Sequence, residues 1–311
     1  MDKLPLRKTL AKKLGLQHWQ LYLLILPALI FLVLFCYLPM YGVIIAFENY
    51  NPILGVFKSP WIGWGNFRSL FQSYWFDIML VNTLELSLYS LPVNTVFPIV
   101  LALLINEVRH EWFKKAVQTI SYAPYFVSVI VTVGICFTFT NADYGVVNKI
   151  LELFGVEPRN WMYEPGAFNF IYIASGLWQG CGWWAIIYVA TLSTVDPSLH
   201  EAATIDGASR FKRIWHINLP AILPTAIILF IMAMGGIMNV GFEKAFLMQN
   251  ASNLTESEII ATYAYKVSIA AVGFKNYGFG SAVGLFNSAI NIVLLLLANF
   301  GAKLLGKESL W

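Results

Sequence analysis

The chain has 311 residues, of which 58% are hydrophobic and only 12% are charged, and its mean hydropathy is +0.65. Soluble domains carry about 25% charged residues, so the composition excludes an ordinary soluble domain and predicts an all-α integral membrane protein. The small net charge of +3 gives no reason to expect nucleic-acid binding. The three cysteines, Cys36, Cys136 and Cys181, lie in apolar runs without metal-ligand spacing, and we predict neither a metal site nor a catalytic role for them.

The chain begins with a basic segment, residues 1–20, in which lysine and arginine alternate with leucine. This pattern predicts an amphipathic segment on the cytoplasmic face of a membrane. The apolar run from Leu21 to Phe47 is longer than the core of a signal peptide, about 7–15 residues, and no small-residue cleavage site follows it. We interpret it as an uncleaved first span of a membrane domain that covers residues 21–305. Residues 48–76 mix turn residues with aromatic residues and predict an external loop.

The second and third predicted spans are Ile78–Ile105 and Thr119–Thr140, joined by a short basic loop. The second span contains Glu85 at membrane depth. An ionisable residue there faces the interior of the helix bundle or a water-filled cavity. Glu85 therefore either belongs to a transport pathway or forms a hydrogen bond with a neighbouring helix.

The fourth predicted span, Phe168–Leu192, follows a polar external loop over residues 141–167 and is rich in glycine and tryptophan at its centre. Tryptophans usually mark the ends of a span rather than its middle. Aromatic rings can stack on sugar rings, and amides can bind their hydroxyl groups. The residues of these types at membrane depth, with Glu85, form a candidate substrate pathway: Trp178, Gln179, Gly180, Trp183, Trp184, Asn239 and Asn287. The alternative is that the tryptophans pack between helices or face lipid.

The last two predicted spans are Ala221–Phe242 and Phe279–Leu305, separated by an external loop over residues 245–278 and followed by a short tail, residues 306–311. These six spans place both termini on one side. On that side, 13 Lys and Arg residues fall in segments 1–19, 106–118, 193–218 and 303–311, against 7 in the longer segments 48–76, 141–167 and 243–278 on the other side. The excess of positive charge marks the side with the termini as cytoplasmic.

The cytoplasmic loop 197–220 lies between two apolar runs, yet residues 201–220 are too polar to cross a bilayer. Apolar residues recur with helical spacing before Gly207 and again after it. This pattern predicts two short helices joined by a glycine corner. Each helix would present an apolar face that needs a protein partner.

The same loop carries a specific motif. Glu201-Ala202-Ala203, then Gly207, then Ile217-x-Leu219-Pro220 follow the pattern EAA-x3-G-x9-I-x-L-P. This motif resembles the cytoplasmic signature of permease subunits of binding-protein-dependent ABC importers. The resemblance implies that the loop docks on an ATP-hydrolysing subunit through Glu201, Ala202, Ala203, Gly207, Ala208, Phe211, Leu219 and Pro220. The alternative is an amphipathic helix that lies on the membrane surface.

The resemblance implies a type I (MetI-like) permease fold in the cytoplasmic membrane of a bacterium. It also implies four kinds of partner: a second permease subunit, two ATP-binding subunits, an extracytoplasmic solute-binding protein and the lipid bilayer. A heterodimer of permeases is typical of such importers, and a homodimer remains open. ATP and magnesium would bind the partner ATPase subunits, and no cofactor is expected on this chain. No Walker motif, zinc motif or nucleophile elbow occurs in the sequence, so we predict a non-catalytic subunit.

The cargo is predicted from a second resemblance. The stretches Cys36–Gly42, Val240–Asn250 and Ala282–Ser288 are similar to permeases of complex-polysaccharide importers, which implies an oligosaccharide cargo. A polyamine, phosphate or glycerol phosphate is the alternative within the transporter class. A polyamine path would favour acidic residues and a phosphate path basic ones, and the spans hold few of either, which favours a neutral sugar. A membrane-embedded enzyme and a scaffold protein are further alternatives that the sequence disfavours.

Overall fold

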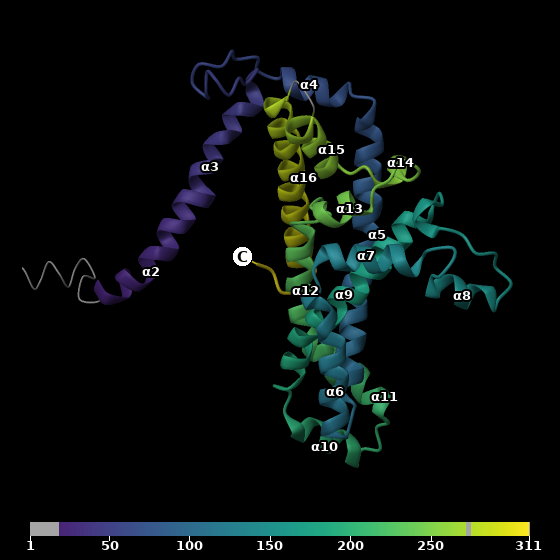
Figure 1. The fold of residues 1–311 in the computed structure, drawn as a ribbon. Coiled ribbons are helices and arrows are strands. Elements are labelled where there is room, and N and C mark those ends of the chain that lie inside the picture. Colours follow the sequence, from purple (N-terminus) through teal and green to yellow (C-terminus); the bar gives the residue numbers. More distant parts are fainter. Residues whose placement is uncertain (1–18, 272–274, 311) are drawn as a thin grey trace, which may run out of the picture.

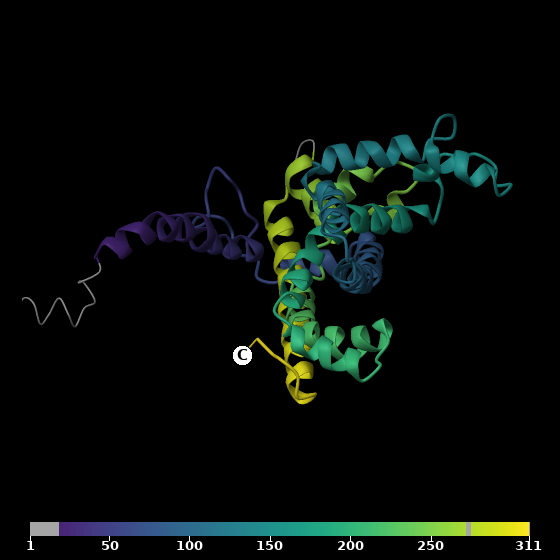
Figure 2. The same cartoon turned by 90° about the horizontal axis from the view of Figure 1, so that it is seen from below.

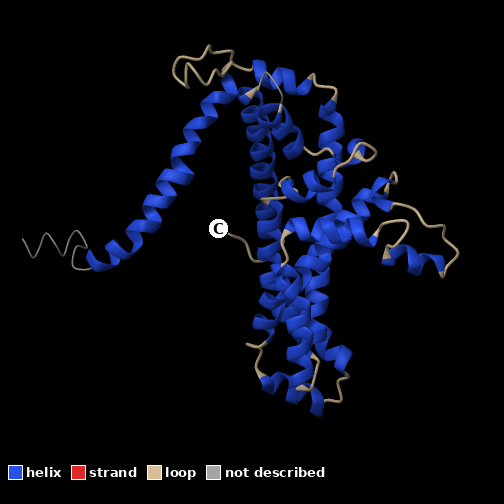
Figure 3. Ribbon diagram, viewed as in Figure 1, coloured by secondary structure: helices blue, strands red, loops and turns tan. Residues whose placement is uncertain are grey.

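The computed structural model describes residues 19–271 and 275–310. Within these ranges the chain forms helices and connecting loops, with a single isolated β-bridge between Glu48 and Trp61 (Figure 3). Most of the predicted basic segment, residues 1–18, lies outside the described residues. The all-helical class expected from the composition is therefore confirmed for the described part of the chain.

The first span extends away from the rest of the molecule (Figures 1 and 2). It runs over Trp19–Phe47, and none of its most apolar stretch is buried. It comprises helix α2 (Trp19–Leu32), a π-helical turn, α3 (Leu38–Met40) and a 3-10 helix (Tyr41–Phe47). Only the 3-10 end packs against the bundle, on the last helix. This agrees with the predicted span Leu21–Phe47.

The bundle is built around two long helices, α5 (Trp75–Asn106) and α9 (Ala167–Leu192), which pack against each other along much of their length (Figure 1). The helices α12 (Leu219–Met234) and α16 (Tyr277–Leu304) complete it. Four helical segments are long and apolar enough to cross a membrane: Trp19–Phe47, α5, Arg210–Met234 and α16. At 26 residues α9 is also long enough, but its polar central residues make it less apolar than these four.

The predicted third span, Thr119–Thr140, is not one continuous helix. The chain forms α6 (Glu111–Tyr122) with a 3-10 extension to Phe126, then α7 (Val129–Phe139), and the two segments bend by 101° at the break. Pro124 lies at this break and has no N–H to donate. The Ser128 hydroxyl caps α7, and the Gln179 amide donates to the Val127 carbonyl over 2.7 Å. The predicted span Thr119–Thr140 is therefore sharply bent, and counting the bent pair as one span gives up to five apolar spans.

The segments predicted to be external loops are more ordered than expected. Residues 48–76 contain the short helix α4 (Gly65–Phe71), and residues 141–167 contain α8 (Val146–Glu152). The prediction that residues 245–278 form a loop was wrong, because most of this segment is helical and packed into the fold. It holds the end of α13 (Phe242–Met248), then α14 (Leu254–Ser257), α15 (Ile260–Tyr265) and a π-helical turn (Lys266–Ala270).

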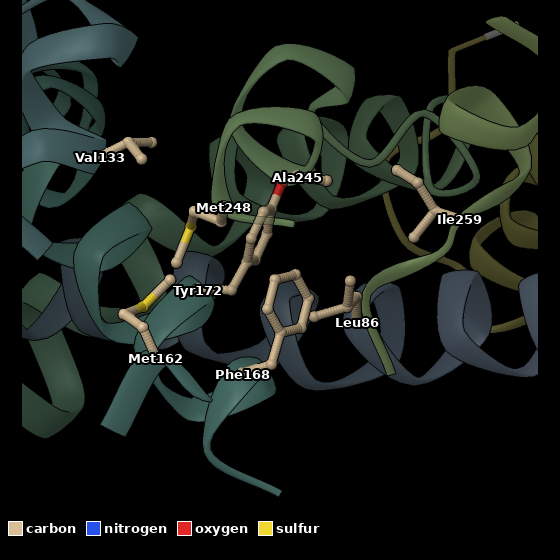
Figure 4. Packing of buried hydrophobic residues seen from close by; sticks show 8 residues of the cluster. All are labelled: Leu86, Val133, Met162, Phe168, Tyr172, Ala245, Met248 and Ile259. Atoms are coloured by element: carbon tan, nitrogen blue, oxygen red, sulfur yellow. The ribbon is translucent and has the colours of Figure 1, made fainter. Parts of the chain in front are cut away.

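The fifth span also differs from its prediction. Its α-helix ends at Met234 rather than at Phe242, because Gly235 and Gly236 begin a series of turns. The next helix, α13, packs on α7 and α15 instead of continuing the span. Alanine and methionine from α13 join a core cluster shared with α5, α7 and α9 (Figure 4). The buried members of this cluster are Leu86, Val133, Met162, Phe168, Tyr172, Ala245, Met248 and Ile259.

Gly182 marks the closest approach between α9 and α6. A Cβ atom built on Gly182 would overlap the backbone carbonyl of Ser121, and a backbone atom cannot move aside cheaply. The residue is buried. The glycine is thus required by the packing of two helices and not by its own backbone conformation.

We expect Gly182→Ala to destabilise the protein by about 1–3 kcal/mol, because it forces α6 and α9 apart. Thermal unfolding in detergent would show this as a lower midpoint. Gly284→Ala on α16 is the matched control, since a Cβ there meets nothing within 4 Å. Equal midpoints for the two variants would contradict the proposed close approach.

Candidate functional site

A cavity of about 580 Å³ lies midway along the helices of the bundle. Its walls come from the middle of α5 and α9, the last turns of α12, and the segment that leads into α13. Four of the predicted pathway residues line it: Gln179, Gly180, Trp184 and Asn239. The structure therefore brings together half of the candidate pathway, contributed by two separate spans.

The other four predicted pathway residues lie elsewhere. Trp183 stacks on Tyr125 with ring centroids 4.4 Å apart, so it packs at the bend between α6 and α7. Glu85 accepts a hydrogen bond from the Asn169 amide over 3.3 Å, which corresponds to the helix-pairing alternative. Trp178 does not line the cavity. Asn287 also lies outside it but reaches it indirectly, because its amide donates to Asn239 over 2.8 Å.

The cavity wall includes irregular backbone between α12 and α13. In a membrane such backbone needs partners within the protein, because lipid offers no hydrogen bonds. The Ser87 hydroxyl donates to the Ile237 carbonyl, and the Met238 N–H donates to the Asn291 side-chain oxygen over 2.9 Å. The Asn291 amide also donates to the Asn239 side chain over 3.2 Å. Side chains of α5 and α16 thus hold the break in one conformation.

The sequence analysis missed Lys244, which lies two residues beyond the end of the fifth predicted span. Lys244 lies in α13, lines the cavity and is 8% exposed. Its ammonium donates to the Tyr172 carbonyl over 2.7 Å and lies 4.4 Å from the centroid of the same ring. No periodicity signal marks this lysine, because its position depends on the turn that precedes α13.

The polar side of α5 was also missed. Ser87, Ser90, Asn94 and Thr95 all line the cavity. Three of them recur at helical spacing within an otherwise apolar span, so they share one face. That spacing was a readable signal of a polar cavity.

The loop predicted to be cytoplasmic forms the expected glycine corner. Helix α10 (Pro197–Ile205) ends with Gly207 at a φ of +75°, a conformation that favours glycine. The Ala208 N–H donates to the Ala203 carbonyl over 2.8 Å, and the Gly207 N–H to the Thr204 carbonyl over 3.1 Å. This pair of bonds is a Schellman motif, which satisfies the carbonyls at the helix end.

Both arms of the corner are further fixed by side chains. Asp196 caps the start of α10, and hydrogen bonds from the Ser198 N–H and hydroxyl hold the pKa of Asp196 below its usual value. Arg213 crosses the corner from α11 (Arg210–Arg213) and donates to the Thr204 hydroxyl over 3.0 Å. The prediction of two short helices was wrong for the second arm. The helical segment there continues from Arg210 to Met234.

The predicted docking residues divide into two groups. Glu201, Ala202, Gly207, Phe211 and Pro220 are exposed, whereas Ala203, Ala208 and Leu219 are partly buried. Leu219 packs on a core cluster rather than facing outward.

Large apolar side chains on this loop are uncovered. Ile205 is 86% exposed, Phe211 71% and Trp215 57%. Beside them, a hollow forms between α10, α11 and the end of α5, and Glu201 and His200 contribute to its lining. The loop, which carries α10 and α11 at the lower end of the ribbon in Figure 1, therefore combines a fixed backbone with an unpartnered apolar face.

Comparison with known proteins gives consistent matches. The family described as "Binding-protein-dependent transport system inner membrane component" matches residues 94–307. The polygalacturonan/rhamnogalacturonan transport system permease protein YteP of Bacillus subtilis is 41% identical over 98% of this chain and 94% of its own length. Protein LplB of the same organism is also 41% identical, over 94% of this chain and 91% of its own length.

The fold is similar to that of a bacterial alginate ABC transporter, which was solved in complex with a periplasmic protein that carries an alginate pentasaccharide. The similarity has a TM-score of 0.86, with 35% identity over 97% of this chain and 99% of the other. With the family match and the relatives that align along nearly the whole chain, this result establishes what kind of subunit the chain is. It belongs to the inner membrane components of binding-protein-dependent transport systems, as a permease subunit of an ABC importer.

Proposed function

We propose that this chain carries an oligosaccharide across the cytoplasmic membrane of a bacterium, as one of two permease subunits of an ATP-driven importer. The observation that carries the proposal is the cavity midway along the bundle. Membrane spans form its walls, together with the irregular backbone between α12 and α13. Transport sites near the bilayer midplane are typically built from such interrupted helices. Relatives along the whole chain include a polygalacturonan and rhamnogalacturonan permease, which supports a polysaccharide fragment as cargo.

The cavity chemistry supports a sugar. Trp184 offers a ring face, Gln179 and Asn94 offer amides, and Ser87 and Ser90 offer hydroxyls. Sugars are bound by such combinations of an aromatic surface with neutral hydrogen-bonding groups. The lining residues include no carboxylate, which disfavours a polyamine. Lys244 favours a second candidate cargo, a phosphate or glycerol phosphate, over a polyamine.

The topology follows from the same proposal. Counting the bent pair α6–α7 and the less apolar α9 as one span each gives six spans, with both termini and the α10–α11 corner in the cytoplasm. The exposed apolar face at this corner would dock on one of two ATPase subunits, which would bind ATP and magnesium. An extracytoplasmic solute-binding protein would deliver the cargo, and the second permease subunit would complete the pathway.

Trp184→Ala is expected to lower cargo uptake about tenfold, because it removes the ring face from the cavity. Uptake of a labelled oligogalacturonide by cells that carry the whole importer measures this. Trp178→Ala is a matched control on the same helix, since Trp178 is similarly exposed (47% against 44%) but does not line the cavity. Equal losses in both variants would argue against the cavity as the transport site.

Gly207→Asp is expected to abolish uptake and the co-purification of the ATPase subunit. The substitution strains a backbone at positive φ and adds a charge beside the apolar docking face. Gly306→Asp is the control, because Gly306 also has a positive φ of +62° and an unobstructed Cβ direction but lies outside the docking loop. Normal uptake by Gly207→Asp would refute docking through this corner, and failure of the control would point to a general loss of folding.

A further inference from the structure

Lys244 is the one charged residue among the described residues that line the cavity. Two ion pairs occur in the described part of the chain, Arg159–Glu164 and Lys266–Glu258, and neither includes Lys244. The side chain is more than nine-tenths buried, and its ammonium group has a single hydrogen bond, to the Tyr172 carbonyl. The cavity thus contains a buried positive charge without an anionic partner.

An ammonium has three N–H donors, so two of them are not used by the bond to Tyr172. The remaining interactions are weak substitutes for an anion. The face of the Tyr172 ring is the other contact of the ammonium, and it carries no net charge. Burying a charge in a protein interior is unfavourable unless an opposite charge accompanies it. A buried lysine in a transport cavity therefore indicates a binding site for an anionic group.

The surroundings leave space at the ammonium. Gly176 faces it from α9, and a Cβ there would lie 3.2 Å from the Lys244 nitrogen. Gly241 precedes α13 and also lines the cavity. Gly176 therefore keeps a side chain away from the ammonium, so a ligand group can approach it.

We propose that Lys244 binds an anionic group of the cargo, and that the cargo is a sugar acid whose carboxylate pairs with this ammonium. This inference rests on the proposed function. The neutral groups that surround Lys244 in the cavity, including Trp184 and Gln179, fit the ring and hydroxyls of the same molecule. A single lysine gives one charge-assisted hydrogen-bonding site, which suits one carboxylate at a time.

The test uses the complete importer in proteoliposomes, with its partner permease, ATPase subunits and binding protein. Uptake of trigalacturonate is compared with uptake of its methyl ester, which has the same rings without the charge, and with uptake of glycerol 3-phosphate. We expect Lys244→Met to lower the ratio of acid to ester uptake about tenfold, and Lys244→Arg to restore most of it. Lys149→Met removes an exposed lysine of α8 and should leave the ratio unchanged.

A second measurement does not depend on delivery by the binding protein. Saturation-transfer NMR on the detergent-solubilised complex without that protein should show weaker contact with trigalacturonate in Lys244→Met than in Lys244→Arg. Equal loss of acid and ester uptake, or equal contact in both variants, would assign Lys244 a structural role and overturn the inference. A wild-type importer that takes up only the ester, or only glycerol 3-phosphate, would also overturn it. In the glycerol 3-phosphate case the sugar cargo of the proposed function fails as well.

Discussion

Backbone groups inside a membrane need hydrogen-bonding partners from the protein, and this constraint governs the centre of the molecule. The chain leaves helical geometry after Met234, midway along the bundle, where lipid would offer no hydrogen bonds. Ser87 and Asn291 supply the missing donor and acceptor, each from a different span. The break in α12 is therefore stable only when α5 and α16 are packed beside it, so it depends on the whole bundle.

The cavity is a consequence of the same break. Because α12 ends early, the following segment turns back into the bundle as α13 instead of continuing outward, and Lys244 enters the cavity from that direction. Tyr172 bonds both to Lys244 and to the segment before α13. Its carbonyl accepts from Lys244, and its hydroxyl donates to the Gly241 carbonyl over 3.5 Å. One hydrogen-bonding network thus holds the irregular wall and positions its only described charge.

The sequence predicted the features that depend on local pattern. The apolar runs closely predicted the bounds of α5, α16 and the first span. Gly207 was expected at the corner where the structure has a positive φ. The sequence did not predict the features that depend on tertiary contacts. The segment 245–278 is polar enough to resemble a loop, yet Glu258 and Thr262 within it are buried and bonded to each other over 2.8 Å. Hydropathy averages cannot distinguish a satisfied buried carboxylate from an exposed one, and for the same reason they gave no sign that Lys244 is buried.

The cavity and the α10–α11 corner are joined by one continuous element. The helical segment Arg210–Met234 begins three residues after Gly207 and ends at the cavity wall, which includes Phe230 and Ala233. Twenty-five residues of helix span roughly 37 Å, and packed helices move as rigid bodies more readily than they deform. Under the proposed function, a displacement of the corner by an ATPase would therefore displace the cavity wall. The hydrogen bonds that Ser87 and Asn291 make to the break after Met234 would pass that displacement on to α5 and α16.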